Sequence, residues 1–142
     1  MILKILYNII RIRIILKKKG ACMTKQRQLV LSIVNESEDH LTAEEIFIEA
    51  KNRISSIAFA TIYNNLNVLV NEKYIARVKS PGNPDRFDRL TIPHEHVVCD
   101  YCGHIMDVHV PEIKKMLEQR LKLSLTSFSL DMHYVCDSCK QN

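Results

Sequence analysis

The cysteines of this chain stand at metal-binding spacing. Four of the five form two Cys-x-x-Cys pairs, Cys99 with Cys102 and Cys136 with Cys139. Each pair lets two thiolates bind one ion from a single tight turn, and two pairs complete a tetrahedral shell with no position open for chemistry. The spacing therefore predicts one structural Zn²⁺ per subunit. A redox-active dithiol and a disulfide scaffold remain the competing interpretations.

A second group of possible ligands, His94-Glu95-His96, lies just before the first cysteine pair. The two histidines are two residues apart, so on a strand both side chains point to the same face. Imidazole and carboxylate together suit ferrous iron or manganese better than a metal that prefers thiolates. Such a cluster also resembles the site of a hydrolytic or oxygen-using enzyme, but no separate general base or nucleophile is evident near it. We therefore do not expect an enzyme.

Composition and charge are those of an ordinary globular protein, with 46% hydrophobic and 25% charged residues. The net charge of +4 permits an acidic partner such as DNA without demanding one. Paired cysteines favour a reducing compartment, so we expect a cytoplasmic protein. Residues 1–16 are apolar but are interrupted by Lys4, Arg11 and Arg13. They favour an amphipathic helix over a membrane span.

The elements that must position these ligands begin with three short helices. Thr24 is expected to cap a helix over 26–35, where apolar residues recur at helical spacing. Thr42 and Glu45 read as a capping box that opens a second helix. A third helix is expected over 59–72.

The outward face of the third helix should carry polar residues: Tyr63, Asn64, Asn65 and Asn67. Strands at 74–78 and 86–88 then flank strong turn residues and form a hairpin. Three helices followed by a hairpin predict a winged helix-turn-helix, whose third helix enters the major groove of DNA.

The pattern changes to strands beyond a hinge predicted at 90–93. A DNA-binding domain is thus expected over 1–89 and an α/β domain of order β-β-α-β over 94–142. Its helix should begin at Pro111 and its last strand should run from Leu125 to Val135. Because so short a domain has little core, zinc and self-association should both stabilise it.

Motifs spread along the chain resemble those of one known family. They are Leu16-Lys17-Lys18-Lys19-Gly20, Thr24-Lys25-Gln26-Arg27, His40-Leu41-Thr42-Ala43-Glu44-Glu45-Ile46, Ala60-Thr61-Ile62-Tyr63-Asn64-Asn65-Leu66, Arg86-Phe87-Asp88, His94-Glu95-His96-Val97-Val98-Cys99 and Cys102-Gly103-His104-Ile105-Met106-Asp107. Together they are similar to the ferric uptake regulator (Fur) family over nearly the whole length. The resemblance implies a homodimeric, metal-dependent repressor that binds a double-stranded DNA operator.

The resemblance also assigns residues. A regulatory Fe²⁺ or Mn²⁺, one per subunit, would be bound between the two domains by His40, Asp88, His94, His96 and Asp107. DNA contacts would come from Lys19, Lys25, Arg27, Thr61, Tyr63, Asn64 and Asn65. The basic residues would touch phosphates, and an asparagine amide could pair with the edge of adenine. Ala58 departs from the family, because a serine is common ahead of the third helix.

Within the family, Asp88 and Asp107 match the peroxide-responsive (PerR) type, since iron-responsive members more often have glutamate there. Asn64-Asn65 points the same way. By resemblance, hydrogen peroxide reacts with the ferrous iron, and His40 or His94 is oxidised. The metal is then lost and the repressor leaves DNA. Iron- or manganese-dependent repression without peroxide sensing is the alternative, and zinc or nickel sensing is a further one.

Overall fold

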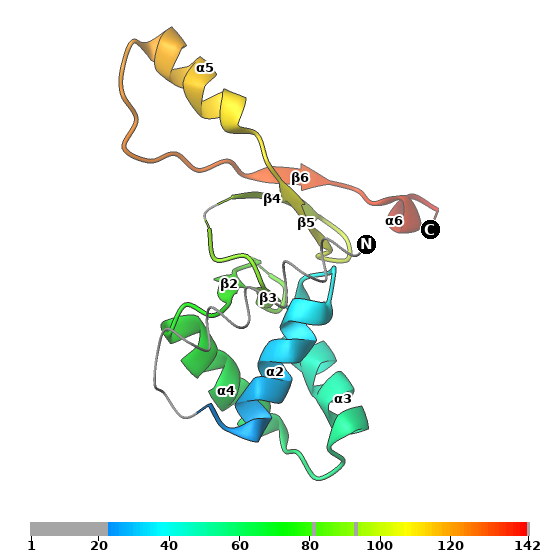
Figure 1. Ribbon diagram of the computed structural model, residues 1–142. Helices are drawn as coiled ribbons and strands as arrows, with labels where there is room; N and C mark the ends of the chain where they lie inside the picture. Colours follow the sequence, from blue (N-terminus) through cyan, green and yellow to red (C-terminus); the bar gives the residue numbers. More distant parts are fainter. Residues whose placement is uncertain (1–22, 81, 93, 142) are drawn as a thin grey trace, which may run out of the picture. The chain divides into compact units, whose positions relative to one another are not determined.

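The computed structural model describes residues 23–80, 82–92 and 94–141, so the expected helix at 1–16 lies outside the described residues, as do Lys19 and Cys22. The chain divides into two compact units (Figure 1). One comprises the described residues up to Lys79 together with Pro84–Thr91, and the other comprises Ser80–Asn83 together with Ile92–Asn142. The α+β class is confirmed. In the described part of the chain, no helix has the length and apolarity needed to cross a bilayer.

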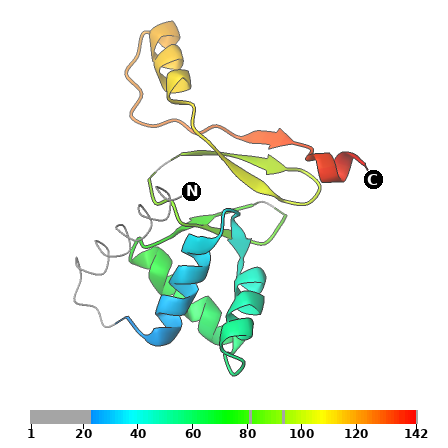
Figure 2. The ribbon, with the colours of Figure 1, turned by 45° about the vertical axis from the view of Figure 1, so that its right-hand side comes forward.

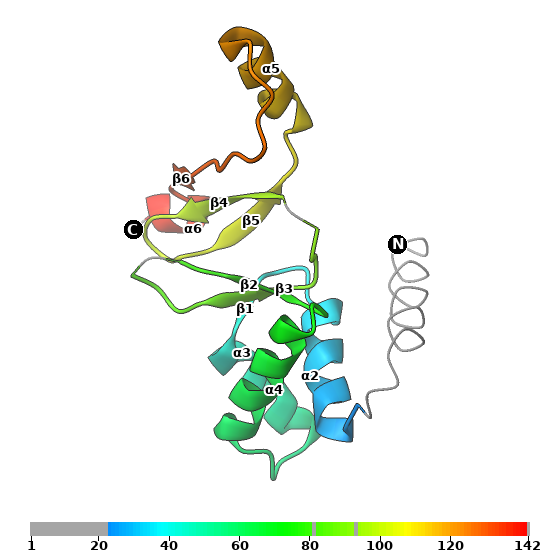
Figure 3. The same cartoon turned by 90° about the vertical axis from the view of Figure 1, so that its left-hand side faces the viewer.

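The described residues of the first unit form three helices and a three-stranded antiparallel sheet. The helices are α2 (Lys25–Glu36), α3 (Ala43–Arg53) and α4 (Phe59–Asn71), and the strands are β1 (Leu41–Thr42), β2 (Ala76–Val78) and β3 (Arg86–Asp88). The helices gather on one side of the sheet, whose strand order is β1-β3-β2 (Figure 3). This is the order of elements predicted for a winged helix-turn-helix, with the two-residue strand β1 added.

Both predicted helix caps are present. Thr24 Oγ1 accepts a hydrogen bond from the Arg27 amide at 3.2 Å and so caps α2. At α3, Thr42 Oγ1 accepts from the Glu45 amide at 3.2 Å, and the Glu45 carboxylate accepts from the Thr42 amide at 2.7 Å. These reciprocal bonds satisfy amides that a helix start otherwise leaves without a partner.

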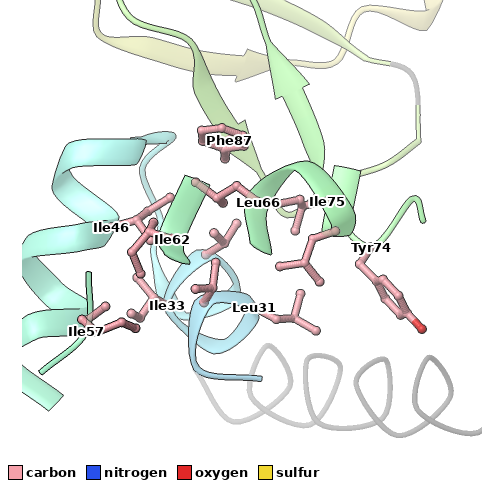
Figure 4. Packing of buried hydrophobic residues seen from close by; sticks show 13 residues of the cluster. Leu31, Ile33, Ile46, Ile57, Ile62, Leu66, Tyr74, Ile75 and Phe87 are labelled. Atoms are coloured by element: carbon pink, nitrogen blue, oxygen red, sulfur yellow. The ribbon is translucent and has the colours of Figure 1, made fainter. Parts of the chain in front are cut away.

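Within the described residues, the core of the first unit is aliphatic apart from two aromatic side chains. It consists of Val30, Leu31, Ile33, Val34, Ile46, Ala50, Ile57, Ile62, Leu66, Leu69, Tyr74, Ile75 and Phe87. Figure 4 shows Phe87 extending from the sheet toward side chains of the helices, including Leu66 and Ile46. Burial on this scale stabilises the unit by about 1.5–3 kcal/mol for each large side chain. The first unit therefore has a sizeable core of its own.

Helix α4 begins without a side-chain cap, because Ala58 occupies the N-cap position in an extended conformation. We expect Ala58→Ser to stabilise the first unit by about 1 kcal/mol, since a serine hydroxyl there can accept from an amide of the first turn. Urea unfolding would measure the gain. Ala60→Ser, also exposed but inside the helix, is the matched control and should cost a few tenths of a kcal/mol. Equal stability of the two variants would contradict this account.

The second unit contains three strands and two helices. They are β4 (Glu95–Cys99), β5 (Ile105–Val108), α5 (Pro111–Leu121), β6 (Met132–Tyr134) and α6 (Asp137–Lys140). Strand β4 lies in the middle, antiparallel to β5 and parallel to β6 (Figure 2). The predicted strand from Leu125 to Val135 is therefore mostly wrong. Only its last part reaches β4 and gains a partner there.

Helix α5 projects away from the sheet of its unit (Figure 2). The sequence predicted that its apolar residues face inward, but Met116 and Leu121 are each 54% exposed. Among the described residues of the second unit, Cys99 and Ile105 are the buried apolar side chains. This unit therefore has far less core than the first, as its length predicted.

Candidate metal centres and nucleic-acid interface

The four paired cysteines come together in the second unit. Cys99 ends β4, Cys102 lies in the turn that follows, and Cys136 and Cys139 lie at and within the short helix α6. Their Sγ atoms all lie within 4.8 Å of one another, and the Sγ atoms of Cys102 and Cys136 are 3.7 Å apart. Zinc–sulfur bonds of about 2.3 Å place the corners of a tetrahedron about 3.8 Å apart. The four thiols thus have the spacing that a closed zinc shell requires.

The thiols of this cluster differ in how readily they ionise. Backbone amides of Cys102 and Cys136 that point at the sulfur lower the pKa of Cys99 to about 6. The neighbouring sulfur of Cys136, followed by burial, raises the pKa of Cys139 to about 12. The fold therefore stabilises the thiolate of Cys99, whereas deprotonation of Cys139 in the metal-free cluster costs free energy. A divalent cation would offset that cost, because cysteine binds metal as the thiolate and the cation stabilises its negative charge.

Three nitrogen and oxygen donors meet beside strands β4 and β5 of the second unit. The register of β4 and β5 places His96 opposite Asp107, and His94 immediately precedes β4. Asp107 Oδ1 is 2.9 Å from His94 Nε2 and 3.4 Å from His96 Nε2. Metal–ligand bonds of about 2.1 Å place neighbouring ligands about 3.0–3.4 Å apart. The trio therefore fits one small divalent ion.

The hydrogen bond made by the His94 ring leaves its other nitrogen available as a metal ligand. Its Nδ1 lies 2.8 Å from the carbonyl oxygen of Ile92, which can only accept, so Nδ1 must carry the hydrogen. In the neutral ring the lone pair is then on Nε2, which faces the carboxylate of Asp107. Two acceptors at that distance require a cation between them, either a proton or a metal ion. A backbone carbonyl that orients a histidine in this way is typical of metal sites.

The first unit has a pair of possible donors of its own. His40 immediately precedes β1, and Asp88 ends the neighbouring strand β3. Both are buried, and His40 Nε2 lies 3.6 Å from Asp88 Oδ2. The other carboxylate oxygen of Asp88 accepts from the Leu90 amide at 2.7 Å, which orients it. This pair supplies two ligands, too few for a complete shell.

Arg86 supports this pair, and sequence reasoning missed that role. Its Nη1 donates to the carbonyl oxygen of His40 at 2.7 Å and lies 3.5 Å from the carboxylate of Glu45. The same carboxylate closes the capping box with Thr42. The start of α3 and the backbone of His40 are thus held by one arginine. The only signal in the sequence was its place two residues before Asp88 on the same strand.

The polar residues predicted for the outward face of α4 differ in their exposure to solvent. Tyr63 and Asn64 are exposed, as expected. Asn67 is half-buried and bonded to Arg77, and Asn65 is buried. Thr61 is half-buried, and Lys25 is exposed in the first turn of α2. The expectation that Asn65 and Asn67 project outward is therefore wrong.

Comparison with known proteins gives a consistent result. The model of the ferric uptake regulator family matches residues 18–140. A relative from Staphylococcus epidermidis, the peroxide-responsive repressor PerR, is 32% identical over 129 residues, which cover 89% of this chain and 86% of that protein. The matches therefore span both units.

Solved structures agree with the sequence matches. The ferric uptake regulator Fur of Helicobacter pylori, whose structure is described as revealing three functional metal-binding sites, aligns with a TM-score of 0.77 and 27% identity. The alignment covers 96% of this chain and 93% of that one. The peroxide stress regulator of Campylobacter jejuni aligns with a TM-score of 0.65 and 30% identity, over 87% of this chain and 96% of that one.

Proposed function

The chain belongs to the ferric uptake regulator family, and from this premise we propose that it is a metal-dependent transcriptional repressor. It binds its DNA operator when a metal ion is bound, and it releases the operator on exposure to peroxide. The observation that carries the proposal is the trio of His94, His96 and Asp107. Its nitrogen and oxygen donors lie at the spacing of a small divalent ion. Such a set favours Fe²⁺ or Mn²⁺.

We assign His40 and Asp88 of the first unit to the same regulatory ion. Neither the pair nor the trio offers a full set of ligands, and together they supply three imidazoles and two carboxylates. An ion that needs both sets to complete its shell would favour the arrangement of the units that brings them together. Metal binding would then shift the population toward the form that binds DNA. The zinc bound by the cysteines has only a structural role in this scheme.

The DNA-binding surface of this proposal is the exposed face of α4. Tyr63 and Asn64 are accessible there, and an asparagine amide can pair with the edge of adenine. Lys25 and Arg27 of α2, with Lys19 before it, would contact phosphates, and Thr61 lies in the first turn of α4. The operator would be double-stranded DNA in the cytoplasm.

A homodimer is part of the proposal. Large apolar side chains remain exposed in the second unit: Met106, Met116, Leu121 and Leu123. A second copy of the chain would cover them, and covering a large apolar side chain yields about 1.5–3 kcal/mol. Two subunits related by a two-fold axis would also present two copies of α4 to the DNA.

Peroxide sensing follows from the type of ligands. Asp88 and Asp107 stand where the sequence pattern of the peroxide-responsive type has aspartate, and the relative from Staphylococcus epidermidis carries that name. Bound ferrous iron would supply the redox chemistry by which hydrogen peroxide oxidises a neighbouring histidine ring. His40 and His94 are the proposed targets. An oxidised ring no longer offers the nitrogen lone pair on which metal binding depends.

The test compares two metals on one protein. When it is loaded with Fe²⁺ or with Mn²⁺, the protein should bind a DNA duplex that has been selected from a random library. Fluorescence anisotropy of the labelled duplex measures this binding. Hydrogen peroxide should release the duplex from the Fe²⁺ form only, with a loss of affinity of about 5–150-fold. Mass spectrometry should then find one added oxygen atom on the peptide containing His40 or His94. Persistence of both forms in peroxide would remove the sensing role.

The alternative is an iron- or manganese-responsive repressor without peroxide sensing. It is favoured by the similarity to the Helicobacter pylori regulator, which extends over nearly the whole chain. In that case a chelator should release both metal forms from DNA, and peroxide should release neither. Zinc or nickel as the regulatory metal would show as DNA binding that requires that ion and not Fe²⁺ or Mn²⁺.

A further inference from the structure

Two adjacent asparagines of α4 have opposite environments. Asn64 is exposed, whereas Asn65 is only 7% exposed and lies on the side of the helix that faces the core. Its neighbours on that side are Ile62, Leu66 and Leu69, all buried. Two residues with the same side chain, one position apart, therefore cannot have the same role.

The amide of Asn65 is used at both ends within the protein. Its Nδ2 donates to the carbonyl oxygen of Thr61 at 2.8 Å, one turn earlier in α4. Its Oδ1 accepts from Arg27 Nε of α2 at 3.1 Å, across 38 residues of sequence. Reading adenine needs one donor and one acceptor on the same amide. Asn65 already uses one N–H and one oxygen lone pair within the protein, and because the residue is only 7% exposed, its second N–H and second lone pair are not presented to DNA.

Arg27 keeps most of its hydrogen-bonding capacity despite this contact. Only Nε is engaged by Asn65, and no other side-chain bond of Arg27 is present within residues 23–80, 82–92 and 94–141. The two Nη groups, with four N–H bonds, remain as a planar fork. Such a fork matches two oxygens of a phosphate, and holding Nε fixes its direction before the phosphate arrives.

We propose that Asn65 is a positioning residue that aims the guanidinium of Arg27 at a DNA phosphate, and that base reading by this asparagine pair belongs to Asn64 alone. The inference rests on the proposed function, because it requires that α4 faces DNA. It predicts a division of labour: Asn65 sets affinity for any sequence, and Asn64 sets the preference for one sequence.

Four variants test this division: Asn64→Ala, Asn65→Ala, Arg27→Ala and Arg27→Lys. The Mn²⁺-loaded protein is titrated at several salt concentrations with two duplexes of equal length, one selected by the wild type from a random library and one with that sequence scrambled. Asn65→Ala should weaken both duplexes alike, by roughly tenfold. The slope of log affinity against log salt should become shallower by about 0.9 for each phosphate that the variant no longer neutralises.

Asn64→Ala is the matched control, because it removes the same side chain from the neighbouring position. It should weaken the selected duplex by roughly tenfold, leave the scrambled one unchanged and keep the salt slope. Coupling gives the second readout. In the Arg27→Lys background, where no Nε is present to be held, adding Asn65→Ala should change affinity by no more than about twofold.

Several results would overturn the inference. One is a weakening confined to the selected duplex in Asn65→Ala, since that would show base reading. Another is a combined Arg27→Ala and Asn65→Ala variant whose affinity falls by the product of the two single effects. If Asn65→Ala does not fold, the test rests on Arg27→Ala. A salt slope for Arg27→Ala equal to that of the wild type would then contradict the proposal. A wild type that binds neither duplex would instead overturn the proposed function itself.

Discussion

Cys136→Ser should abolish zinc binding and unfold the second unit while the first unit stays folded. The reason is the uneven distribution of the core. Among the described residues, thirteen buried apolar side chains form the core of the first unit (Figure 4), whereas Cys99 and Ile105 are the buried apolar side chains of the second. In small zinc domains, metal binding supplies about 10–16 kcal/mol of what is also folding free energy.

Hydrogen exchange followed by mass spectrometry would separate the two units. Amides of β4 and β5 should lose protection in Cys136→Ser, and amides of α2 and α4 should keep it. Metal analysis should give no zinc for this variant and one zinc per chain for the wild type. Cys22→Ser is the control, since Cys22 belongs to neither pair, and it should retain zinc and protection. Full protection of β4 in zinc-free Cys136→Ser would show that the metal does not hold this unit together.

The features that could be predicted from sequence are those decided by residues close together in the chain. The capping box of Thr42 and Glu45 spans one helical turn, so local spacing is sufficient to form it. The same holds for Thr24 at the start of α2. Strand alternation predicted that His94 and His96 share a face, and although β4 begins only at Glu95, both rings do face Asp107. Each of these predictions depends on geometry that a few consecutive residues fix by themselves.

The features that could not be predicted depend on partners distant in the chain. Strand β1 exists because Leu41 and Thr42 pair with β3, and nothing in two residues signals a strand. The alternating pattern between Leu125 and Val135 looks like one strand, yet only Met132–Tyr134 finds an edge of β4 to join. Strand pairing is thus a tertiary property, and the sequence pattern gives only an upper limit to the strand's length.

Asn65 shows the same limit at a functional surface. Position 65 lies three residues after Ile62 and four before Leu69, so helical spacing places it on the inward face, and the expectation of an outward side chain followed from its polarity alone. Its burial depends on Arg27 from another helix, which supplies the donor that makes a buried amide oxygen acceptable. The helical pattern therefore identifies the buried position, but the partner that satisfies its amide oxygen becomes known only from the tertiary structure.

His96→Ala should abolish metal-dependent DNA binding without disturbing the zinc. His96 lies opposite Asp107 in the register of β4 and β5, and its Nε2 is 3.4 Å from the carboxylate oxygen that also faces His94. Its side chain is partly exposed and does not belong to the core cluster of the first unit. Removing the ring therefore deletes a ligand at little cost to folding. Mutation of residues that only support ligands typically costs 10–100-fold in metal affinity, so loss of a ligand should exceed about 100-fold.

Two measurements on the same preparation make this result specific. Isothermal titration with Mn²⁺ should show the loss of the regulatory site, and metal analysis should still give one zinc per chain. His104→Ala is the matched control, because it removes a half-buried imidazole of the same sheet region that lies outside the trio. Its Mn²⁺ affinity and DNA binding should equal those of the wild type.

The comparison of the two histidine variants separates a regulatory metal from a structural one. A structural ion would be needed for the fold, so losing its ligand would lower the unfolding temperature together with DNA binding. A regulatory ion changes only which arrangement of a folded chain is populated, so DNA binding should fall while the melting temperature in the absence of Mn²⁺ stays the same. If His96→Ala bound the selected duplex in Mn²⁺ as tightly as His104→Ala, the trio would not be the regulatory site.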